Sequence, residues 1–410
     1  MIRRLTFSIA LFGLLLSGCA QEAQQQAQGV ARAAVGEDDL LYVWSFDADE
    51  QSSDFLAVVE ADASTPDYGR VVDTVPVGFA GGAHHTEHRM PSGDSFFANS
   101  FLAGTTFVFG LEVPRRPLVR ESFVERGPFA YPHSFERLPS GNVLATFQNQ
   151  LGTLDAPGGL AELAPNGRLL RSASAQDAAD PQLRPYSLAV LPELDRVVST
   201  TADMRGKRLA TSVQIWRLSD LELLETLLLP PGPRGTEQQM PAEPRVLPGG
   251  RRVLVSTFSC GLFLLDGLDG TEPSARFVHS FPYEPPHRCA LAISMGRYWI
   301  QTVPTSESLV VLDVDDPELP EVVQELWLGE DMRPHWIASD VVGRRVVATG
   351  RGAMEPRVVM LDFDPRSGHL EVDTDFGEPG AELPGLRFDR AEWPHGNTGS
   401  AVPHGALFLR

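Results

Sequence analysis

Histidine recurs at one position of a repeated sequence motif, and its imidazole could bind a transition metal. The motif is a polar residue, usually after proline, followed by an apolar strand, a Pro/Gly turn and a second apolar strand. Its clearest copy begins at Pro132-His133 and turns at Pro139-Ser140-Gly141. Aligning that turn with Pro91-Ser92-Gly93 in an earlier copy places His85 on His133. Neutral imidazole suits copper, iron, zinc and nickel, so this recurrence predicts a metal site.

The same position can be followed through the rest of the chain. The residues that occupy it are His85, His133, Tyr186, Arg245, His287 and His335, and a degenerate copy begins at either Pro394-His395 or Pro403-His404. We expect His85, His133, His287 and His335 to bind the metal, and His84, His395 or His404 to complete the site. Because His84 and His85 are neighbours on a strand, both can be ligands only if the strand end twists.

Charged residues and one cysteine accompany these positions. Glu87 and Glu136 are candidates for orienting the imidazoles through hydrogen bonds. Arg245 either pairs with Glu243 or holds an anionic substrate, because a permanent cation opposes a metal ion. Cys260 is a further candidate, as a free thiol near the ring of histidines. The alternative is that the histidines only line a wet channel mouth and share hydrogen bonds with these charged groups.

The elements that must position these residues are short β-strands. The copies are spaced roughly 40–70 residues apart, a period typical of repeat folds. Their apolar runs are short and β-branched with turns between them, so each unit is a small antiparallel sheet. Six clear copies and a seventh predict an all-β, seven-bladed β-propeller over residues 38–410, with the recurring position at the start of each innermost strand. The early strands, such as Leu41–Phe46, should share a blade with the C-terminal segment and so close the ring.

The N-terminal segment is typical of an exported lipoprotein. Arg3 and Arg4 precede an apolar run that is shorter than the about 20 residues needed to span a bilayer. Leu16-Ser17-Gly18-Cys19 resembles the bacterial lipoprotein box. We therefore expect a signal peptide at 1–18, lipidation of Cys19 and a flexible tether at 19–37. The protein would then lie in the cell envelope, on the outer membrane facing the periplasm, and contact the membrane through Cys19 alone.

Charge and cysteine content narrow the possible partners. The 410-residue chain has a formal net charge of −20, which repels phosphate backbones, so nucleic acid is not an expected partner. A small-molecule substrate or a protein partner stays open. Beyond Cys19, the cysteines are Cys260 and Cys289. They fall in different predicted blades, and we expect them to be free thiols.

The order of several motifs resembles the selenium-binding protein family, which includes methanethiol oxidase. The stretch Phe55–Tyr68 resembles the start of that family, His84-His85 its His-His pair, and Glu243-Pro244-Arg245 its Glu-x-Arg element. Near the end, Val359–Asp364 and Asp375–Pro379 follow the family's order. The resemblance implies a propeller with a metal-dependent oxidase activity on a small thiol, with copper as the cofactor.

Two departures separate this chain from the family pattern. The family has a cysteine pair shortly after the His-His pair, whereas Thr86-Glu87-His88 follows here. The family's C-terminal histidine would fall at Pro384. These differences leave three hypotheses: a copper-dependent oxidase of a thiol-type substrate, a non-catalytic propeller that binds a ligand or a protein, and a four-histidine iron oxygenase by analogy with other propellers.

Overall fold

The structure of the protein is a computed structural model. It describes residues 39–153, 155–178, 180–206, 208–270, 272–281, 288–352, 356–378, 381 and 383–410. The expected signal peptide, the tether with Cys19, and His287 lie outside the described residues.

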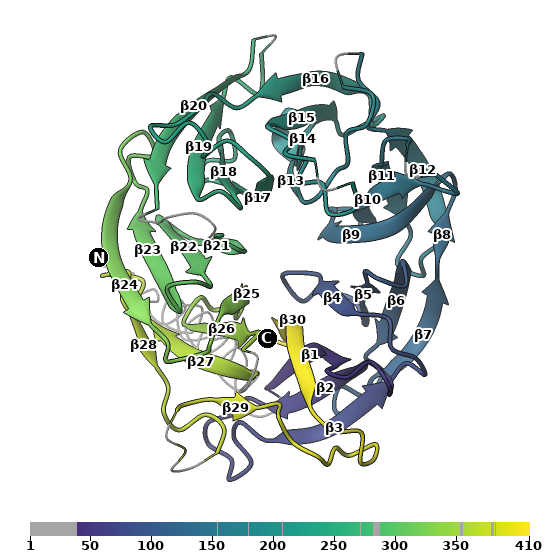
Figure 1. Cartoon of the computed structure of the whole chain (residues 1–410), viewed down its shortest axis with the longest axis vertical. Helices are drawn as coiled ribbons and strands as arrows, with labels where there is room; N and C mark the ends of the chain where they lie inside the picture. The colour runs from purple at the N-terminus through teal and green to yellow at the C-terminus, as the bar shows by residue number, and fades with distance from the viewer. Residues whose placement is uncertain are drawn as a thin grey trace, which may run out of the picture. The chain divides into compact units, whose positions relative to one another are not determined.

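Seven antiparallel β-sheets, counted over the described residues, are arranged in a ring (Figure 1). The first three, from the innermost strand outwards, are β4 (Ala83–Thr86), β5 (Ser95–Ser100), β6 (Thr105–Gly110) and β7 (Leu118–Phe123); β9 (Phe129–Arg137), β10 (Val143–Gln150), β11 (Gly159–Leu163) and β12 (Leu169–Ser174), with β8 (Glu125–Arg126) paired to β9; and β13 (Leu188–Leu191), β14 (Arg196–Thr200), β15 (Ser212–Arg217) and β16 (Leu223–Leu228). A 3-10 turn, η1 (Pro192–Leu194), joins β13 to β14.

The next three sheets repeat this order. They are β17 (Pro241–Val246), β18 (Val253–Thr257), β19 (Gly261–Asp266) and β20 (Ser274–Ser280); β21 (Ala292–Met295), β22 (Tyr298–Val303), β23 (Ser308–Asp313) and β24 (Glu321–Trp327); and β25 (Pro334–Ser339), β26 (Arg345–Gly350), β27 (Arg357–Phe363) and β28 (Leu370–Val372), with β29 (Leu386–Arg387) also paired to β27. Each sheet is a blade whose first strand faces the centre of the ring (Figure 1). The prediction of a seven-bladed all-β propeller is confirmed.

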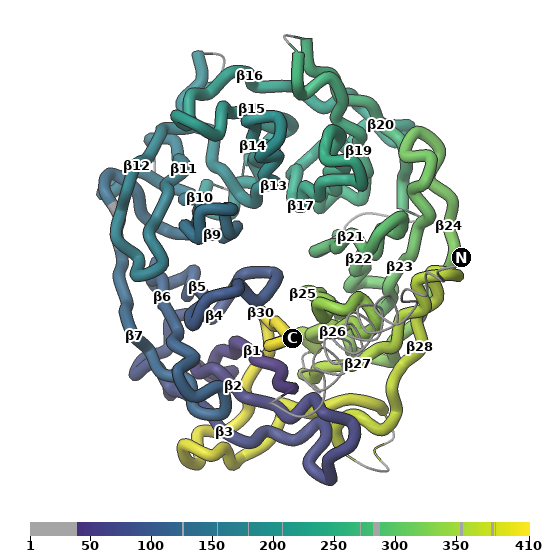
Figure 2. The backbone as a smooth tube through the Cα atoms, turned by 180° about the vertical axis from the view of Figure 1, so that it is seen from behind, coloured from purple at the N-terminus to yellow at the C-terminus, as the bar shows by residue number. Residues whose placement is uncertain are grey.

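The seventh blade, called the closing blade below, joins the two ends of the described chain. It contains β30 (Ala401–Phe408), β1 (Leu40–Asp47), β2 (Phe55–Glu60) and β3 (Val71–Pro76) in that order. The antiparallel register runs from Leu41 opposite Phe408 to Asp47 opposite Ala401. Figure 2 shows the yellow C-terminal strand beside the purple N-terminal one. The innermost strand of this blade therefore comes from the C-terminus, as the sequence predicts.

Burial follows the position of each strand within its blade. The second and third strands, such as β18 and β19, are buried almost throughout, because neighbouring blades pack on both of their faces. The fourth strands, such as β16, are only half-buried, because they form the outer rim. Among the described residues, no helix has the length and apolarity to span a membrane.

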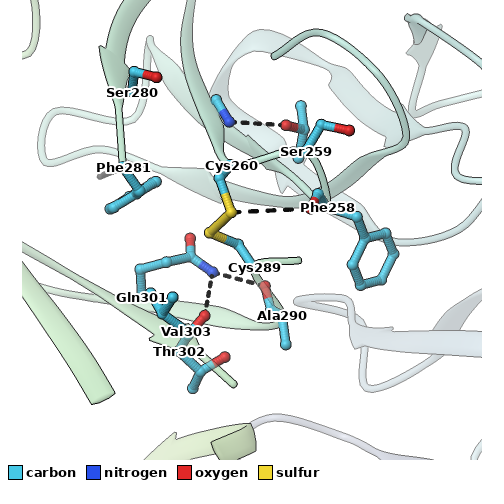
Figure 3. The surroundings of a disulfide bond; sticks show 12 residues. Phe258, Ser259, Cys260, Ser280, Phe281, Cys289, Ala290, Gln301, Thr302 and Val303 are labelled. Carbon is cyan, nitrogen blue, oxygen red and sulfur yellow. Dashed lines mark hydrogen bonds between the residues drawn. A yellow bond between two sulfur atoms is a disulfide. The ribbon is translucent and has the colours of Figure 1, made fainter. Parts of the chain in front are cut away.

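A disulfide joins two adjacent blades. Cys260 follows β18 and Cys289 precedes β21, and their sulfur atoms are bonded with Cα atoms 5.1 Å apart (Figure 3). The backbone supports this contact, since Cys289 N–H donates to the carbonyl of Phe258. The prediction of two free thiols is therefore wrong, and Cys260 is not available as a thiol. The turn after the second strand of one blade meets the entry to the first strand of the next, a contact that the assignment to separate blades did not anticipate.

Removing this disulfide should destabilise the ring at the junction of β17–β20 with β21–β24. The chain-entropy model for the 29-residue separation gives a loss of about 3.5 kcal/mol in the free energy of unfolding. We expect a Cys260→Ala/Cys289→Ala protein to unfold at lower denaturant concentration than wild type. Thiol labelling of unreduced, denatured Cys19→Ser protein should find no free group. Two labelled thiols would contradict the bridge.

Candidate metal centre

Three imidazoles from two neighbouring blades meet inside the ring. His84 and His85 lie on β4 and His133 on β9, and one nitrogen of each lies within 4.8 Å of the others. A register shift between Ala83 and Thr86 interrupts the pairing of β4 with β5. This bulge changes the strict alternation of side chains, so the rings of His84 and His85 stack with centroids 4.2 Å apart. Both neighbours therefore reach the same site.

Two further histidines extend this group. The ring of His404, on β30, lies 4.3 Å from that of His84, and the ring of His335, on β25, lies 4.6 Å from that of His404. We call His84, His85, His133, His335 and His404 the histidine cluster. It draws on four blades, including the closing blade.

Hydrogen bonds on one ring nitrogen leave the other nitrogen free. Nδ1 of His133 lies 2.9 Å from the carbonyl oxygen of Tyr186, so it donates its proton there. Nδ1 of His85 lies 3.2 Å from the Ser134 hydroxyl oxygen. The Tyr186 carbonyl can only accept, so Nε2 of His133 carries a bare lone pair, which is the state that binds a metal. The Ser134 hydroxyl can accept from Nδ1 of His85, and that tautomer leaves Nε2 of His85 in the same state.

The free nitrogens are buried and have no hydrogen-bond partner. They are Nε2 of His85, Nε2 of His133, Nδ1 of His84 and both ring nitrogens of His404. Leaving a buried polar atom unpaired costs about 1–3 kcal/mol, so a group of such atoms in one place requires an explanation. A metal ion bound by several of these nitrogens would satisfy them, and the residues present fit such an ion.

Burial also keeps these imidazoles neutral. It lowers the pKa of His84, His85, His335 and His404 well below the ordinary histidine value, and neighbouring positive groups lower it further. Burial lowers the pKa of His133 to about 3, against the opposing effect of its bond to Tyr186. Neutral imidazole is the ligand form, so no proton has to leave the cluster before a metal binds.

The structure does not bring every candidate histidine to the cluster. Nδ1 of His395 lies 2.8 Å from the Thr74 hydroxyl, and its ring packs against Phe55 in the closing blade. Of the two late histidines that the sequence left open, His404 joins the cluster and His395 does not. His287 lies outside the described residues.

Arg245 does not lie among the imidazoles of the histidine cluster. In β17, Ala242 rather than Arg245 occupies the place that His335 has in β25, because both follow the first proline of their strand. Arg245 pairs with buried Glu243 at 2.8 Å, which confirms the expected ion pair. Burial raises the pKa of Glu243, while Arg245 and a hydrogen bond from Ser187 at 3.0 Å oppose the rise.

In the described part of the chain, neither candidate carboxylate forms a hydrogen bond with an imidazole of the histidine cluster. Glu87 pairs with Arg137 at 2.7 Å, and burial raises its pKa to about 7 despite that partner. Burial also raises the pKa of Glu136, with Arg245 and Arg89 opposing. The groups that orient the imidazoles are the Ser134 hydroxyl and the Tyr186 carbonyl. Sequence reasoning placed Tyr186 in the ring but missed Ser134, whose only signal is its position beside His133.

A cavity of about 400 Å³, called the chamber below, lies at the C-terminal ends of innermost strands such as β9 and β17. Its wall includes Glu87, His88 and Arg245. His88 stacks on Trp336 with ring centroids 4.3 Å apart, and Trp336 in turn contacts the His85 ring edge-on at 5.0 Å. One aromatic layer therefore lies between the chamber and the histidine cluster.

Comparison with known proteins supports the distant resemblance seen in the sequence. No family model matches the chain. The chain is 26% identical over 225 residues to methanethiol oxidase of Hyphomicrobium sp., a match that covers 48% of this chain and 50% of that protein. The matched region thus spans about half the length of this curated relative.

Solved structures share the fold over most of the chain. A hypothetical selenium-binding protein of Sulfolobus tokodaii matches with a TM-score of 0.75 at 16% identity, covering 91% of this chain and 94% of that one. A periplasmic gluconolactonase of Pseudomonas aeruginosa matches with a TM-score of 0.64 at 12% identity, covering 91% and 99%. At these identities the likeness shows the propeller fold. Together with the methanethiol oxidase match, it makes this chain a distant relative of selenium-binding proteins.

The buried neutral imidazoles predict how the stability of metal-free protein changes with pH. Their pKa values are lowered in the folded state, so below about pH 6.5 the unfolded chain binds protons that the folded chain does not. Stability should therefore fall as the pH falls from 7.5 to 5.5. Each such histidine contributes at most about 1.4 kcal/mol per pH unit.

Urea unfolding of chelator-treated protein at several pH values measures this slope. A His404→Leu protein should show a smaller loss of stability over the same range, because one buried base is removed. Burial raises the pKa of Asp54 to about 6 and that of Glu87 to about 7, which opposes this loss equally in both proteins. Identical pH dependence in wild type and His404→Leu would therefore contradict a neutral His404 in the cluster.

Proposed function

We propose that the protein is a metal-binding β-propeller oxidoreductase that uses copper to oxidise a small thiol-type substrate. The observation that carries the proposal is the convergence of buried, unpartnered imidazole nitrogens from β4, β9 and β30. The match to methanethiol oxidase over half the chain supports the reaction class. Bound copper would accept electrons from the thiol and pass them to dioxygen, which would be the terminal oxidant.

The residues of the chain have defined parts in this proposal. His84, His85 and His133 hold the metal, with His404 and His335 as neighbours that can complete its coordination. The Tyr186 carbonyl fixes the tautomer of His133 and leaves its Nε2 unprotonated, while the Ser134 hydroxyl orients the His85 ring. Phe101 packs edge-on against His133 at 5.5 Å and contributes to the apolar surroundings that keep water from the cluster.

The chemistry must proceed without a cysteine pair beside the histidines. Cys260 and Cys289 are buried and bonded to each other, so neither offers a thiolate. Any redox step at the cluster therefore depends on the metal and the substrate. The protein could also be a non-catalytic binding propeller, an alternative favoured by the presence of the chamber.

Elemental analysis of purified protein, expressed with copper or with iron supplementation, tests the metal site. We expect stoichiometric metal in wild type and loss of most of it in His85→Ala, His133→Ala and His404→Ala. His395→Ala is the matched control, since its ring is also partly buried but lies outside the cluster. Added metal should raise the melting temperature of wild type and of the control, but not of the cluster variants.

The outcomes separate the three hypotheses. Copper that is retained through purification supports the oxidase, and iron in its place supports the oxygenase. Wild-type protein that is empty under every loading condition removes both and leaves the binding propeller. Metal that persists in all three cluster variants would place the site elsewhere.

We further propose that the propeller is anchored in the cell envelope through lipidated Cys19. The lipoprotein box at Leu16–Cys19 supports this, and a disulfide is consistent with an oxidising compartment. Cell fractionation should find wild type with the membranes and a Cys19→Ser protein in the aqueous fraction. Retention of the Cys19→Ser protein in the membranes would exclude this anchor.

A further inference from the structure

The chamber wall concentrates arginine in a chain that is strongly acidic overall. Arg89, Arg137 and Arg245 all line it, while the whole chain has a formal net charge of −20. Guanidinium groups stay charged at every relevant pH and carry five N–H donors each. The side chains of Arg137 and Arg245 keep 19% and 15% of their surface exposed, so both can still meet a ligand.

The carboxylates nearby do not fully balance these three cations. Glu87 is committed to Arg137 and Glu243 to Arg245. Burial raises the pKa of Glu136, which disfavours its charged form. Among the described residues, Arg89 is exposed and has no carboxylate at ion-pair distance. Arg89 acts electrostatically on Glu136, so its charge is only partly balanced, since burial disfavours the charged form of that carboxylate.

Two buried donors near the chamber have no hydrogen-bond partner. Nε2 of His88 accepts from Arg245 at 3.1 Å, so the proton of neutral His88 is on Nδ1, which is buried without a partner. Nε of Arg137 is likewise buried and unpaired. Oxygens of Glu87 and Glu243 are unpaired as well, so the preference of the chamber for negative charge depends on its guanidinium groups.

Other residues of the wall are apolar. Phe135, Leu188, Val190, Val246 and Ile293 contribute to it. A cavity of about 400 Å³ is within the size range of small-molecule sites, which combine apolar walls with a few charged groups. A fitting ligand therefore has one anionic end and a short apolar portion.

We infer that the chamber binds a small organic anion, a carboxylate or sulfonate with a short apolar tail. The chamber is separated from the histidine cluster by the stacked rings of His88 and Trp336. Anion binding itself stands on the chamber wall and does not require the metal.

Calorimetric titration of metal-free protein with propanoate and with propanesulfonate tests the site. Propanamide serves as the neutral isostere and propylammonium as the cation of similar size. We expect the two anions to bind more tightly than either comparison compound, and their affinity to fall as salt is raised. Fluorescence of Trp336, which stacks on a wall residue, offers an independent readout.

Variants locate the binding. Arg89→Gln should weaken propanoate binding about fivefold, the effect of losing roughly 1 kcal/mol of ionic contact. Arg70→Gln, which removes another exposed arginine, just before β3 of the closing blade, should leave it unchanged. Arg245→Gln combined with Glu243→Gln removes the cation without stranding the buried carboxylate and should weaken binding further.

Specific outcomes would overturn the inference. They are absence of anion binding in folded wild-type protein, equal affinity for propanoate and propanamide, and wild-type affinity in both chamber variants. The same titrations in a His85→Ala background keep the two proposals apart. If the His85→Ala protein retains no metal but still binds the anion, the chamber is supported independently of the metal site. If wild type retains its metal but does not bind the anion, the inference about the chamber fails and the proposed metal site stands.

Discussion

Closure of the ring by β30 is the constraint on which the candidate site depends. This strand is the innermost of a blade whose other strands come from the start of the described chain, and it carries His404. The backbone of β30 also accepts hydrogen bonds from the next blade, since Thr349 donates to the carbonyl of His404 and Trp336 to that of Ala406. His404 therefore reaches His84 only when both ends of the chain have paired. The fold and the histidine cluster form together.

A second constraint acts at the start of β4. Buried Asp54, just before β2, accepts the backbone N–H of Gly81 and of Ala83 on one carboxylate oxygen. Burial raises its pKa to about 6 even though these bonds oppose the rise. The carboxylate thus ties the closing blade to the segment that leads into His84. A charge that is costly to bury is retained where it fixes the backbone beside two candidate ligands.

The sequence was sufficient for features that repeat and insufficient for features that arise between blades. The shared phase of His85 and His133 could be predicted, because the same turn follows both at the same distance, although β9 begins four residues before His133. The bulge that stacks His84 on His85 has no such signal, since it depends on how β4 pairs with β5. Cys260 and Cys289 belong to different repeats, so counting repeats separated them, although adjacent blades place their Cα atoms 5.1 Å apart.

The alignment of Arg245 with the histidines failed because β17 contains two prolines. The sequence comparison matched Pro244 to Pro334, whereas the strand register makes Pro241 the counterpart of Pro334. Arg245 is therefore the fifth residue of its strand, whereas His335 is the second residue of β25. This difference places the Arg245 guanidinium beside His88 and not among the imidazoles of the histidine cluster.

Trp336 links the separate layers of the channel. Its indole N–H donates a hydrogen bond to the carbonyl of Ala406 in β30. Its ring centroid lies 5.0 Å from that of His85 and 4.3 Å from that of His88, which stacks on it. The side chain is fully buried, so it cannot move without disturbing at least one of these contacts. A ligand in the chamber that displaces His88 would act on Trp336, and through Trp336 on a candidate metal ligand. This packing gives the chamber a physical path to the histidine cluster that requires no movement of the blades.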